Sequence, residues 1–296
     1  MLLLNILFIT TNIFSTYSKN IKPLLTFYDF DPETQSGWVD FGIDLSIDCL
    51  QKGYYEYGIS SLFRIGRYNE TWSDCWTKNN TSPKVYGLPS SRILADKGLY
   101  KDWRKNVRLT VDLIKPLINE GVVTGVFLGD EQVCGGHQTW DEMSQVAYEF
   151  RYLLGDTPIL YMNECVGAIT NSTTEIPSAL TYFSIDIYDS GAEEVNKVKT
   201  FYENKIFPIL FEPTKTFVIP GIFGNPTKPF MPQEKLLLEK IKAYKKWIDN
   251  ETRIAGLNSW HYLHRTNIKY PNDTYPYGLG VIDFQRVLHK IQEFWN

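Results

Sequence analysis

The chain has 296 residues, of which 43% are hydrophobic and 15% aromatic, enough to bury the core of one large α/β domain or of two small ones. Its formal net charge of -4 and the lack of a basic stripe argue against nucleic acid as the main partner. The 19 Tyr, 17 Phe and 8 Trp suit either stacking on sugar rings or a tyrosine-rich core.

The beginning of the chain resembles a targeting segment. Residues 1–14 are apolar apart from Asn and Thr, and residues 16–18 offer small side chains at the spacing of a signal-peptide cleavage site. We expect residues 1–18 to be a secretory signal and residues 19–296 a single mature domain that is secreted or lumenal, with the lysosome as one destination. Because a basic start is missing, an uncleaved anchor is the alternative. No other segment approaches 18 uninterrupted apolar residues, so we expect no stable membrane insertion once the signal is removed.

Four cysteines and several glycosylation sequons agree with export. The cysteines form no Cys-x-x-Cys motif, which disfavours a structural zinc site and a redox pair. We expect Cys134 to bond Cys165, since both lie just past the ends of consecutive predicted strands, and this leaves Cys49 with Cys75. The sequons begin at Asn69, Asn79, Asn80, Asn171, Asn250 and Asn272.

Strand-like and helical segments alternate along the chain. In chain order the pattern predicts strand 24–30, helix 45–57, strand 59–65, a long excursion over 66–101, helix 102–120, strand 122–128, helix 139–154, strand 158–162, strand 180–189, helix 192–204, strand 216–224, helix 232–249, strand 254–260, a weak strand 277–282 and helix 283–295. Seven or eight such units without a linker indicate a parallel sheet covered by helices.

The number of units favours a (β/α)8, TIM-type barrel in one domain. An open doubly wound sheet is disfavoured because no glycine-rich phosphate turn follows the first strand. The numbering of the strands around the barrel has one alternative. If residues 38–44 also form a strand, the acid-bearing strand at 122–128 is the fourth and the strand at 254–260 is the eighth.

Acidic residues follow three of the predicted strands, and in a barrel the carboxyl ends of strands carry the chemistry. The expected catalytic residues are Asp130, Glu131, Glu164 and Asp186. Neighbouring strands lie about 5 Å apart, so these carboxyl groups can reach the roughly 5–9.5 Å separation of the paired acids in glycoside hydrolysis. That chemistry needs one acid kept protonated and one charged carboxylate.

Further strand-end residues are candidates for substrate binding. They are Tyr188, Trp260, Asn163, Asn258, His261 and Tyr161. Each candidate has a structural alternative: an Asp-Glu pair also caps a following helix, Glu164 also suits a loop ion pair, and Trp260 also suits packing. His261 and His264 lack a third ligand, so we expect neither a metal nor a cofactor.

The segment Leu128-Gly129-Asp130-Glu131-Gln132-Val133 resembles the Gly-Gly-Asp-Glu-x motif of β-N-acetylhexosaminidases, which are secreted or lysosomal (β/α)8 enzymes. The resemblance implies that Asp130 orients the acetamido group of the substrate and that Glu131 is the general acid/base. It also implies that Trp260 and Tyr188 line the pocket. Leu128 stands where the motif has its first Gly.

A second segment, Asn163-Glu164, resembles the strand-end Asn-Glu of retaining glycosidases that use two glutamates. That resemblance implies Glu164 as acid/base, but no Glu follows the strand at 254–260 to act as its partner. Both resemblances imply glycoside hydrolysis and differ in mechanism.

The sequence therefore predicts a secreted glycoside hydrolase that cleaves O-glycosidic bonds in a carbohydrate or glycoconjugate. Glu131 is the expected acid/base, and Asp130, Glu164 or Asp186 takes the second role. Two alternatives remain: a non-catalytic, secreted carbohydrate-binding barrel protein, and a metal-dependent hydrolase that uses Asp, Glu and His side chains.

Overall fold

A computed structural model of the chain describes residues 23–27, 40–44, 46–66, 88–169, 174–188, 193–221, 230–259 and 285–295. The strands are β1 (Leu24–Phe27), β2 (Gly42–Asp44), β3 (Ser61–Arg64), β4 (Val123–Asp130), β5 (Ile159–Cys165), β6 (Tyr182–Asp186), β7 (Lys215–Ile219) and β8 (Ile254–Ser259). The helices are α2 (Ile47–Tyr57), α3 (Trp103–Glu120), α4 (Trp140–Leu154), α5 (Glu193–Phe201), α6 (Phe230–Ile248) and α7 (Gln285–Trp295). Short helical turns are η1 (Pro89–Arg92), η2 (Val166–Ile169), η3 (Tyr202–Ile206) and η4 (Phe207–Ile209).

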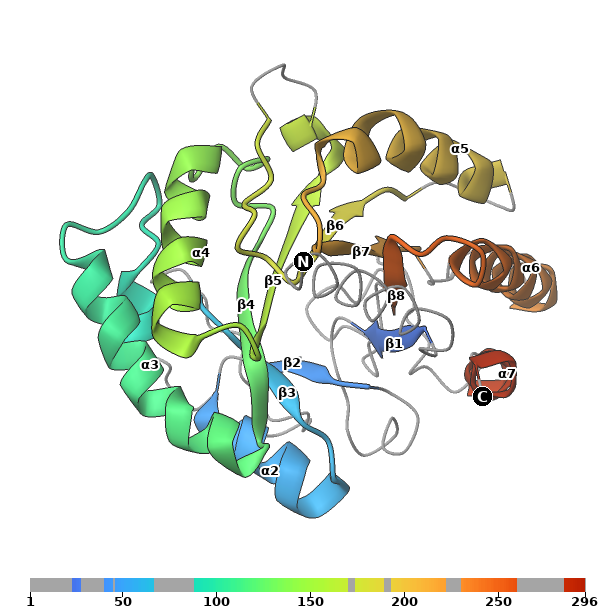
Figure 1. Ribbon diagram of the computed structural model, residues 1–296. Helices are drawn as coiled ribbons and strands as arrows, with labels where there is room; N and C mark the ends of the chain where they lie inside the picture. Colours follow the sequence, from blue (N-terminus) through green and yellow to red (C-terminus); the bar gives the residue numbers. More distant parts are fainter. Residues whose placement is uncertain are drawn as a thin grey trace, which may run out of the picture.

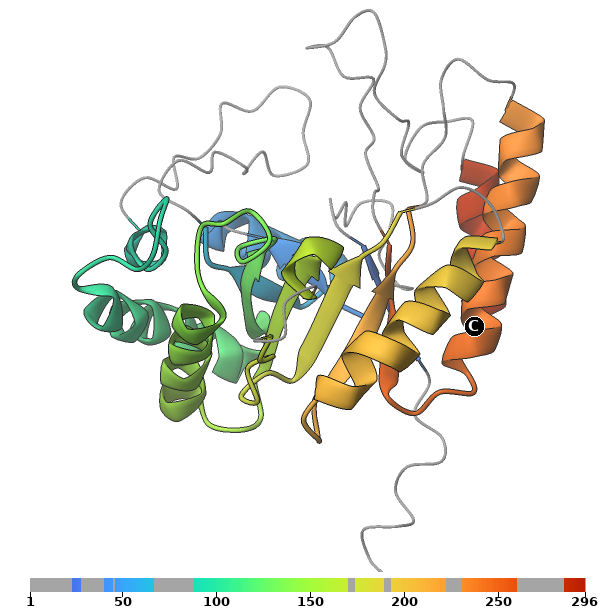
Figure 2. The same ribbon diagram turned by 90° about the horizontal axis from the view of Figure 1, so that it is seen from above.

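The strands form one sheet of 8 parallel strands in the order β1-β8-β7-β6-β5-β4-β3-β2. Between β1 and β2, the Asp40 amide donates to the Leu25 carbonyl at 2.9 Å, and Thr26 Oγ1 donates to the Phe41 carbonyl at 2.7 Å. The ring of strands is therefore nearly closed, with the helices outside it (Figure 1), and the view turned by 90° shows the same arrangement (Figure 2). The predicted (β/α)8 barrel is confirmed.

Strand β2 lies within residues 38–44 and settles the register. The acid-bearing strand is β4 and the last strand is β8, as expected for the eight-strand alternative. β7 ends at Ile219, earlier than predicted, because Pro220 has no amide hydrogen to continue the ladder. The expected signal segment, the weak strand at 277–282 and residues 67–87 of the excursion lie outside the described residues.

Buried aromatic side chains lie in two layers, one inside the barrel and one between its strands and the helices. Inside the barrel lies a cluster made of Phe41, Leu62, Phe127, Tyr161, Phe217 and Ile219. The Tyr161 ring is central to it, with ring centroids at 5.1 Å from Phe127 and 5.4 Å from Phe217. The second layer, between strands and helices, includes the fully buried Tyr202 and Tyr244. A tyrosine-rich core thus accounts for part of the aromatic content.

The helix after β4 begins where the sequence predicts it. Thr139 Oγ1 accepts from the Glu142 amide at 3.2 Å, and Glu142 Oε2 accepts from the Thr139 amide at 2.8 Å, which together form a capping box. This pair of bonds fixes the far end of the loop between β4 and α4. Across the described ranges, no helix has the length and apolar character that a bilayer crossing requires.

Candidate active site

One extra residue in β4 decides which acid faces the inside of the barrel. Phe127 pairs with Tyr161 of β5, but the next pair is Asp130 with Asn163, so β4 takes three steps where β5 takes two. Strand alternation from the inward-facing Phe127 would otherwise bring Glu131 inside. This β-bulge places Asp130 inside instead and leaves Glu131 just beyond the strand end.

The bulge depends on Gly129. Its φ angle is 153°, and a Cβ atom there would lie 2.5 Å from Cγ of Gln132. Gln132 is itself held, because its Nε2 donates to the Asp130 carbonyl at 2.8 Å. Only glycine fits this position without moving its neighbours, so the Gly-Asp-Glu order has a physical reason in the bend of β4.

Glu131 has a left-handed backbone with φ 54°, which is uncommon for a residue with a side chain. Such a conformation costs about 1–2 kcal/mol, and here it is held by two hydrogen bonds: the Glu131 amide donates to the Asn163 carbonyl at 3.0 Å, and the Gly135 amide donates to the Glu131 carbonyl at 2.8 Å. Glu131 is exposed to solvent. Partial burial of its carboxyl group, and then the charge of Asp130, raise its pKa.

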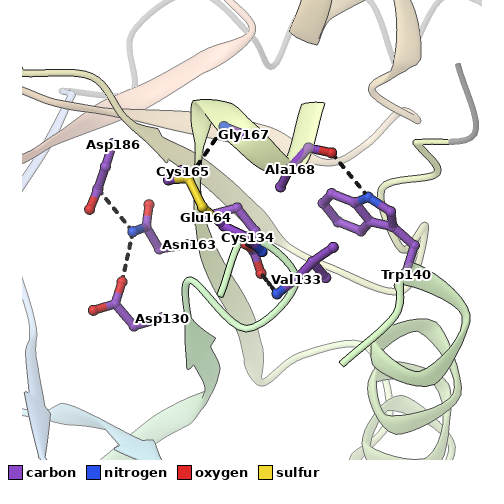
Figure 3. The surroundings of a disulfide bond; sticks show 10 residues. All are labelled: Asp130, Val133, Cys134, Trp140, Asn163, Glu164, Cys165, Gly167, Ala168 and Asp186. Atoms are coloured by element: carbon purple, nitrogen blue, oxygen red, sulfur yellow. Dashed lines mark hydrogen bonds between the residues drawn. A yellow bond between two sulfur atoms is a disulfide. The ribbon is translucent and has the colours of Figure 1, made fainter. Parts of the chain in front are cut away.

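Asn163 joins two carboxyl groups on the neighbouring strands. Its side-chain nitrogen donates to Oδ1 of Asp130 at 2.8 Å and to Oδ1 of Asp186 at 2.9 Å (Figure 3). Asn163 is fully buried, and the three residues come from β4, β5 and β6 in order. The expected meeting of acids at the carboxyl end of the barrel is therefore present for Asp130 and Asp186.

Asp130 lies close enough to Asp186 to change the pKa of that carboxyl group. Burial, and then the charge of Asp130, raise the pKa of Asp186 to about 8, although hydrogen bonds from Asn163 and Tyr188 oppose the rise. Asp186 consequently holds a proton at neutral pH. The charge of Glu131 adds to the rise, which shows that all three acids share one region.

Tyr188 is at the rim of this group. Its hydroxyl donates to Asp186, and burial of the hydroxyl together with that neighbouring charge raises its pKa. The side chain nevertheless exposes 40% of its surface. A tyrosine with a fixed hydroxyl and an accessible ring suits the substrate-binding role expected for it.

Glu164 faces away from the aspartates, because alternation along β5 sends it to the side opposite Asn163. Its two carboxylate oxygens accept from the amides of Val133 at 2.8 Å and Cys134 at 2.9 Å (Figure 3). The side chain is fully buried, and burial is the main cause that raises its pKa to about 7. In this geometry Glu164 anchors the loop after β4.

A disulfide reinforces the same anchor. Cys134 and Cys165 are bonded, with their Cα atoms 5.7 Å apart, as predicted from their positions past consecutive strands (Figure 3). The loop that follows Glu131 is thereby attached to the end of β5 by one covalent bond and two hydrogen bonds. The other expected pairing involves Cys75, which lies outside the described residues.

Two expected substrate-binding residues are buried beneath the aspartates. Tyr161 and Asn258 are fully buried, and Asn258 Nδ2 donates to the Tyr161 hydroxyl at 2.8 Å. They reach the acids through Ser184, which the sequence analysis missed. Its signal was available: Ser184 lies two residues before Asp186 in a strand and therefore on the same face. Trp260 and His261 lie outside the described residues.

Within the part of the chain that the structure describes, no cluster of three or more His, Cys, Asp or Glu side chains could hold a metal ion. Asp130 and Asp186 face an amide donor instead of each other.

Comparisons with known proteins identify the fold. No model of a protein family matches the sequence, and no curated protein matches it. Among solved structures, a β-glucuronidase from Ruminococcus gnavus in complex with uronic deoxynojirimycin is 11% identical, with a TM-score of 0.58 over 93% of this chain and 50% of that one. A β-glucuronidase from an uncultured Clostridium sp. is 12% identical, with a TM-score of 0.54 over 92% of this chain and 50% of that one. A GH2 β-galacturonidase from Eisenbergiella tayi bound to galacturonate is 11% identical, with a TM-score of 0.50 over 87% and 44%.

These likenesses agree with the barrel described above. The chain spans about half the length of the solved structures it matches. At such identities the shared property is the (β/α)8 fold, and the chemistry has to be argued from the residues of the site.

Proposed function

We propose that the protein is a glycoside hydrolase that cleaves O-glycosidic bonds at the carboxyl end of its barrel. The observation that carries the proposal is the meeting of Asp130, Glu131 and Asp186, of which Asp186 keeps a proton at neutral pH and Glu131 is accessible with a raised pKa. Glycoside hydrolysis needs an acid that can donate a proton beside a second carboxyl group, and this cluster brings acids with raised pKa values next to a further carboxyl group. The glycosidase names of the similar structures support it.

The surroundings of Glu131, Asp130 and Glu164 indicate what each of them does. Glu131 is exposed and has a raised pKa, so it can donate a proton to a leaving-group oxygen and take one back from water. Asp130 faces the barrel and accepts from Asn163, which holds it as the second carboxylate. Glu164 receives no role in bond cleavage, because both of its oxygens bind loop amides.

The kind of sugar follows in part from charge. Asp130 and Glu131 both raise the pKa of Asp186, so the site disfavours additional negative charge. The carboxylate of a uronide would meet the same repulsion from these acids. We therefore place neutral sugars before uronides, and among neutral sugars the resemblance of Asp130-Glu131 to the hexosaminidase motif puts N-acetylhexosaminides first.

A panel of aryl glycosides tests the activity. The purified full chain is incubated with N-acetylglucosaminides, glucosides, galactosides, glucuronides and galacturonides, and the released phenol is measured. Glu131→Gln is expected to lower kcat/KM by about 10²–10⁴-fold on any substrate that is cleaved, the usual contribution of a general acid/base. The matched control is Glu203→Gln, an exposed Glu on the helical surface that makes an ion pair with Lys199 at 3.8 Å.

Two results would contradict the proposal: full activity of Glu131→Gln, or no cleavage anywhere in the panel by folded protein. Binding of a sugar without cleavage would support the non-catalytic carbohydrate-binding barrel instead. Mass spectrometry of the incubated glycan separates intact from cleaved material.

Export is a second part of the proposal. The disulfide between Cys134 and Cys165 is of a kind that persists in oxidising compartments, and the sequon residue Asn250 is exposed. Secretion of the full chain from cultured eukaryotic cells, with a gel shift on removal of N-glycans, is the expected result. Asn250→Gln should remove one glycan, whereas retention of unglycosylated protein inside the cell would contradict export.

A further inference from the structure

A chain of buried hydrogen bonds runs from β8 to the two aspartates. Asn258 Nδ2 donates to the Tyr161 hydroxyl at 2.8 Å, and the Tyr161 and Ser184 hydroxyls lie 2.7 Å apart. Ser184 Oγ in turn donates to Oδ1 of Asn163 at 2.7 Å. Asn258, Tyr161, Ser184 and Asn163 are all fully buried, so their hydrogen bonds are made within the protein.

These contacts fix the direction of every bond. Ser184 has one hydrogen, which it gives to Asn163, so the Tyr161 hydroxyl must be the donor to Ser184. Tyr161 then has no hydrogen left for Asn258, which agrees with Asn258 donating to it. The chain therefore has one polarity, and it ends with the carbonyl of the Asn163 amide facing Ser184.

That polarity decides whether the Asn163 nitrogen or its carbonyl oxygen faces the two aspartates. With its carbonyl on Ser184, Asn163 presents both amide hydrogens to Asp130 and Asp186. If the amide turned over, its carbonyl oxygen would face the two carboxyl groups, and each of them would need a proton to avoid repulsion. The two orientations of one side chain thus favour opposite charge states of the same pair of acids.

We propose that Ser184 and Tyr161 are positioning residues of the site: their hydroxyls hold the Asn163 amide with its hydrogens toward Asp130 and Asp186. The proposal rests on the proposed function for its catalytic meaning. Its structural content, the control of ionisation of two aspartates by a buried hydroxyl, stands without any substrate. Neither hydroxyl touches the reacting atoms, so both act through Asn163.

The observed polarity leaves one buried carbonyl oxygen without a hydrogen bond from any described residue at the open end of the chain. Among the described residues, Oδ1 of Asn258 is buried and accepts no hydrogen bond. An unpaired buried carbonyl is unfavourable, and the reversed polarity would pair this oxygen with the Tyr161 hydroxyl. The carboxyl groups, which accept hydrogen bonds more strongly when charged, offset this cost at the other end, and the Ser184 hydroxyl pairs the Asn163 carbonyl that faces it.

The test follows the aspartates directly. Full-length protein carrying ¹³C-labelled Asp carboxyl groups is titrated by NMR, and Asp130→Asn and Asp186→Asn assign the two signals. Ser184→Ala removes the donor to Asn163, and the pKa of Asp186 is expected to rise by about one unit, since hydrogen bonds to its charged form are lost. Tyr161→Phe should produce a smaller rise in the same direction, and Ser184→Thr should restore the wild-type titration.

A matched control deletes another buried hydroxyl. Thr110 on α3 is fully buried, and its Oγ1 donates to the Asn106 carbonyl at 2.8 Å, far from the acids in the fold. Thr110→Val should lower the melting temperature without moving either Asp titration. Ser184→Ala that lowers the melting temperature in the same way, with the Asp186 titration unchanged, would overturn the proposal.

The experiments distinguish a failure of the positioning role from a failure of the proposed hydrolase activity. If the NMR titration shifts but no glycoside is cleaved, the positioning role stands and the hydrolase proposal fails. If glycosides are cleaved, the pH profile of kcat/KM in Ser184→Ala should move with the NMR titration. Should Ser184→Ala fail to fold, Tyr161→Phe, which removes a single oxygen atom, decides the question by the same titration.

Discussion

Asp130 and Asp186 bind the same amide nitrogen, that of Asn163, at 2.8 and 2.9 Å, although they belong to strands β4 and β6. The nitrogen carries two hydrogens, so each aspartate receives one. This arrangement brings two acids together in a buried region while Asp186 keeps its proton, because its pKa is raised to about 8. The site therefore contains an acid that is neutral at neutral pH, held beside a second carboxyl group by one amide.

The first prediction concerns stability against pH. Asp186 has a pKa of about 8 in the folded chain and about 3.9 when unfolded, so between these values the unfolded chain releases its proton first. The stability that the protonated group provides is present below pH 4 and is lost as pH rises toward 8. Asp186→Asn lacks this titration. The melting temperature of the variant should therefore rise relative to that of wild type as the pH increases from 4 to 8.

Thermal unfolding followed by circular dichroism from pH 4 to pH 9 measures this effect. Asp112→Asn, at an exposed position of α3, is the matched control and should follow the wild-type curve. Parallel curves for Asp186→Asn and wild type would show that Asp186 ionises normally in the folded chain.

The second prediction concerns the bulge in β4. Gly129→Ala introduces a Cβ atom 2.5 Å from Cγ of Gln132 and places a side chain at φ 153°. We expect a loss of about 1–3 kcal/mol in the free energy of unfolding, together with loss of glycosidase activity as Asp130 is displaced. Urea denaturation and aryl-glycoside assays measure the two effects.

Gly155→Ala is the control for the bulge. Gly155 also has a positive φ, 78°, but a Cβ atom there meets nothing within 4 Å, and it ends α4 away from the acids. It should lose stability and keep its activity. Equal activity of Gly129→Ala and Gly155→Ala would mean that the bulge does not aim Asp130.

The third prediction concerns the loop anchor. Glu164→Gln replaces one acceptor oxygen with a donor that faces a loop amide, and the expected cost is about 1–3 kcal/mol of unfolding free energy. Hydrogen exchange of the Val133 and Cys134 amides should become faster, since these groups lose their carboxylate partner. The Met143 amide, which donates to the Thr139 carbonyl at 3.0 Å within α4, is the internal reference. Unchanged exchange at Val133 and Cys134 would refute the anchor.

The fourth prediction concerns the leaving group. If Glu131 protonates the departing oxygen, Glu131→Gln should lose about 10²–10⁴-fold in rate on a substrate with a basic leaving group. It should lose much less on a dinitrophenyl glycoside, whose leaving group needs no proton. Steady-state rates on a series of aryl glycosides give the dependence on leaving-group pKa. A uniform loss across the series would assign Glu131 a role other than proton donor.

The sequence by itself determined the order of helices α2 to α7 and of strands β1 and β3 to β8, and with it the barrel; it offered β2 only as an alternative. Runs of β-branched and aromatic residues and the spacing of apolar residues in helices are local properties of the chain. The pairing of Cys134 with Cys165 followed from the same logic, because the two residues lie near the ends of consecutive strands. The clustering of Asp130 and Asp186 followed too, since parallel strands end on one side of a barrel.

Only the tertiary structure decided which way the acids point. The side chains of a strand alternate between two faces, so their direction depends on register against the neighbouring strand, and the extra residue beside Gly129 shifts that register. The same alternation sends Asn163 into the barrel and Glu164 onto the loop amides. Alternation along β6 places Ser184 on the same face as Asp186, but only the packing of β5, β6 and β8 brings its hydroxyl into contact with Tyr161 and Asn163.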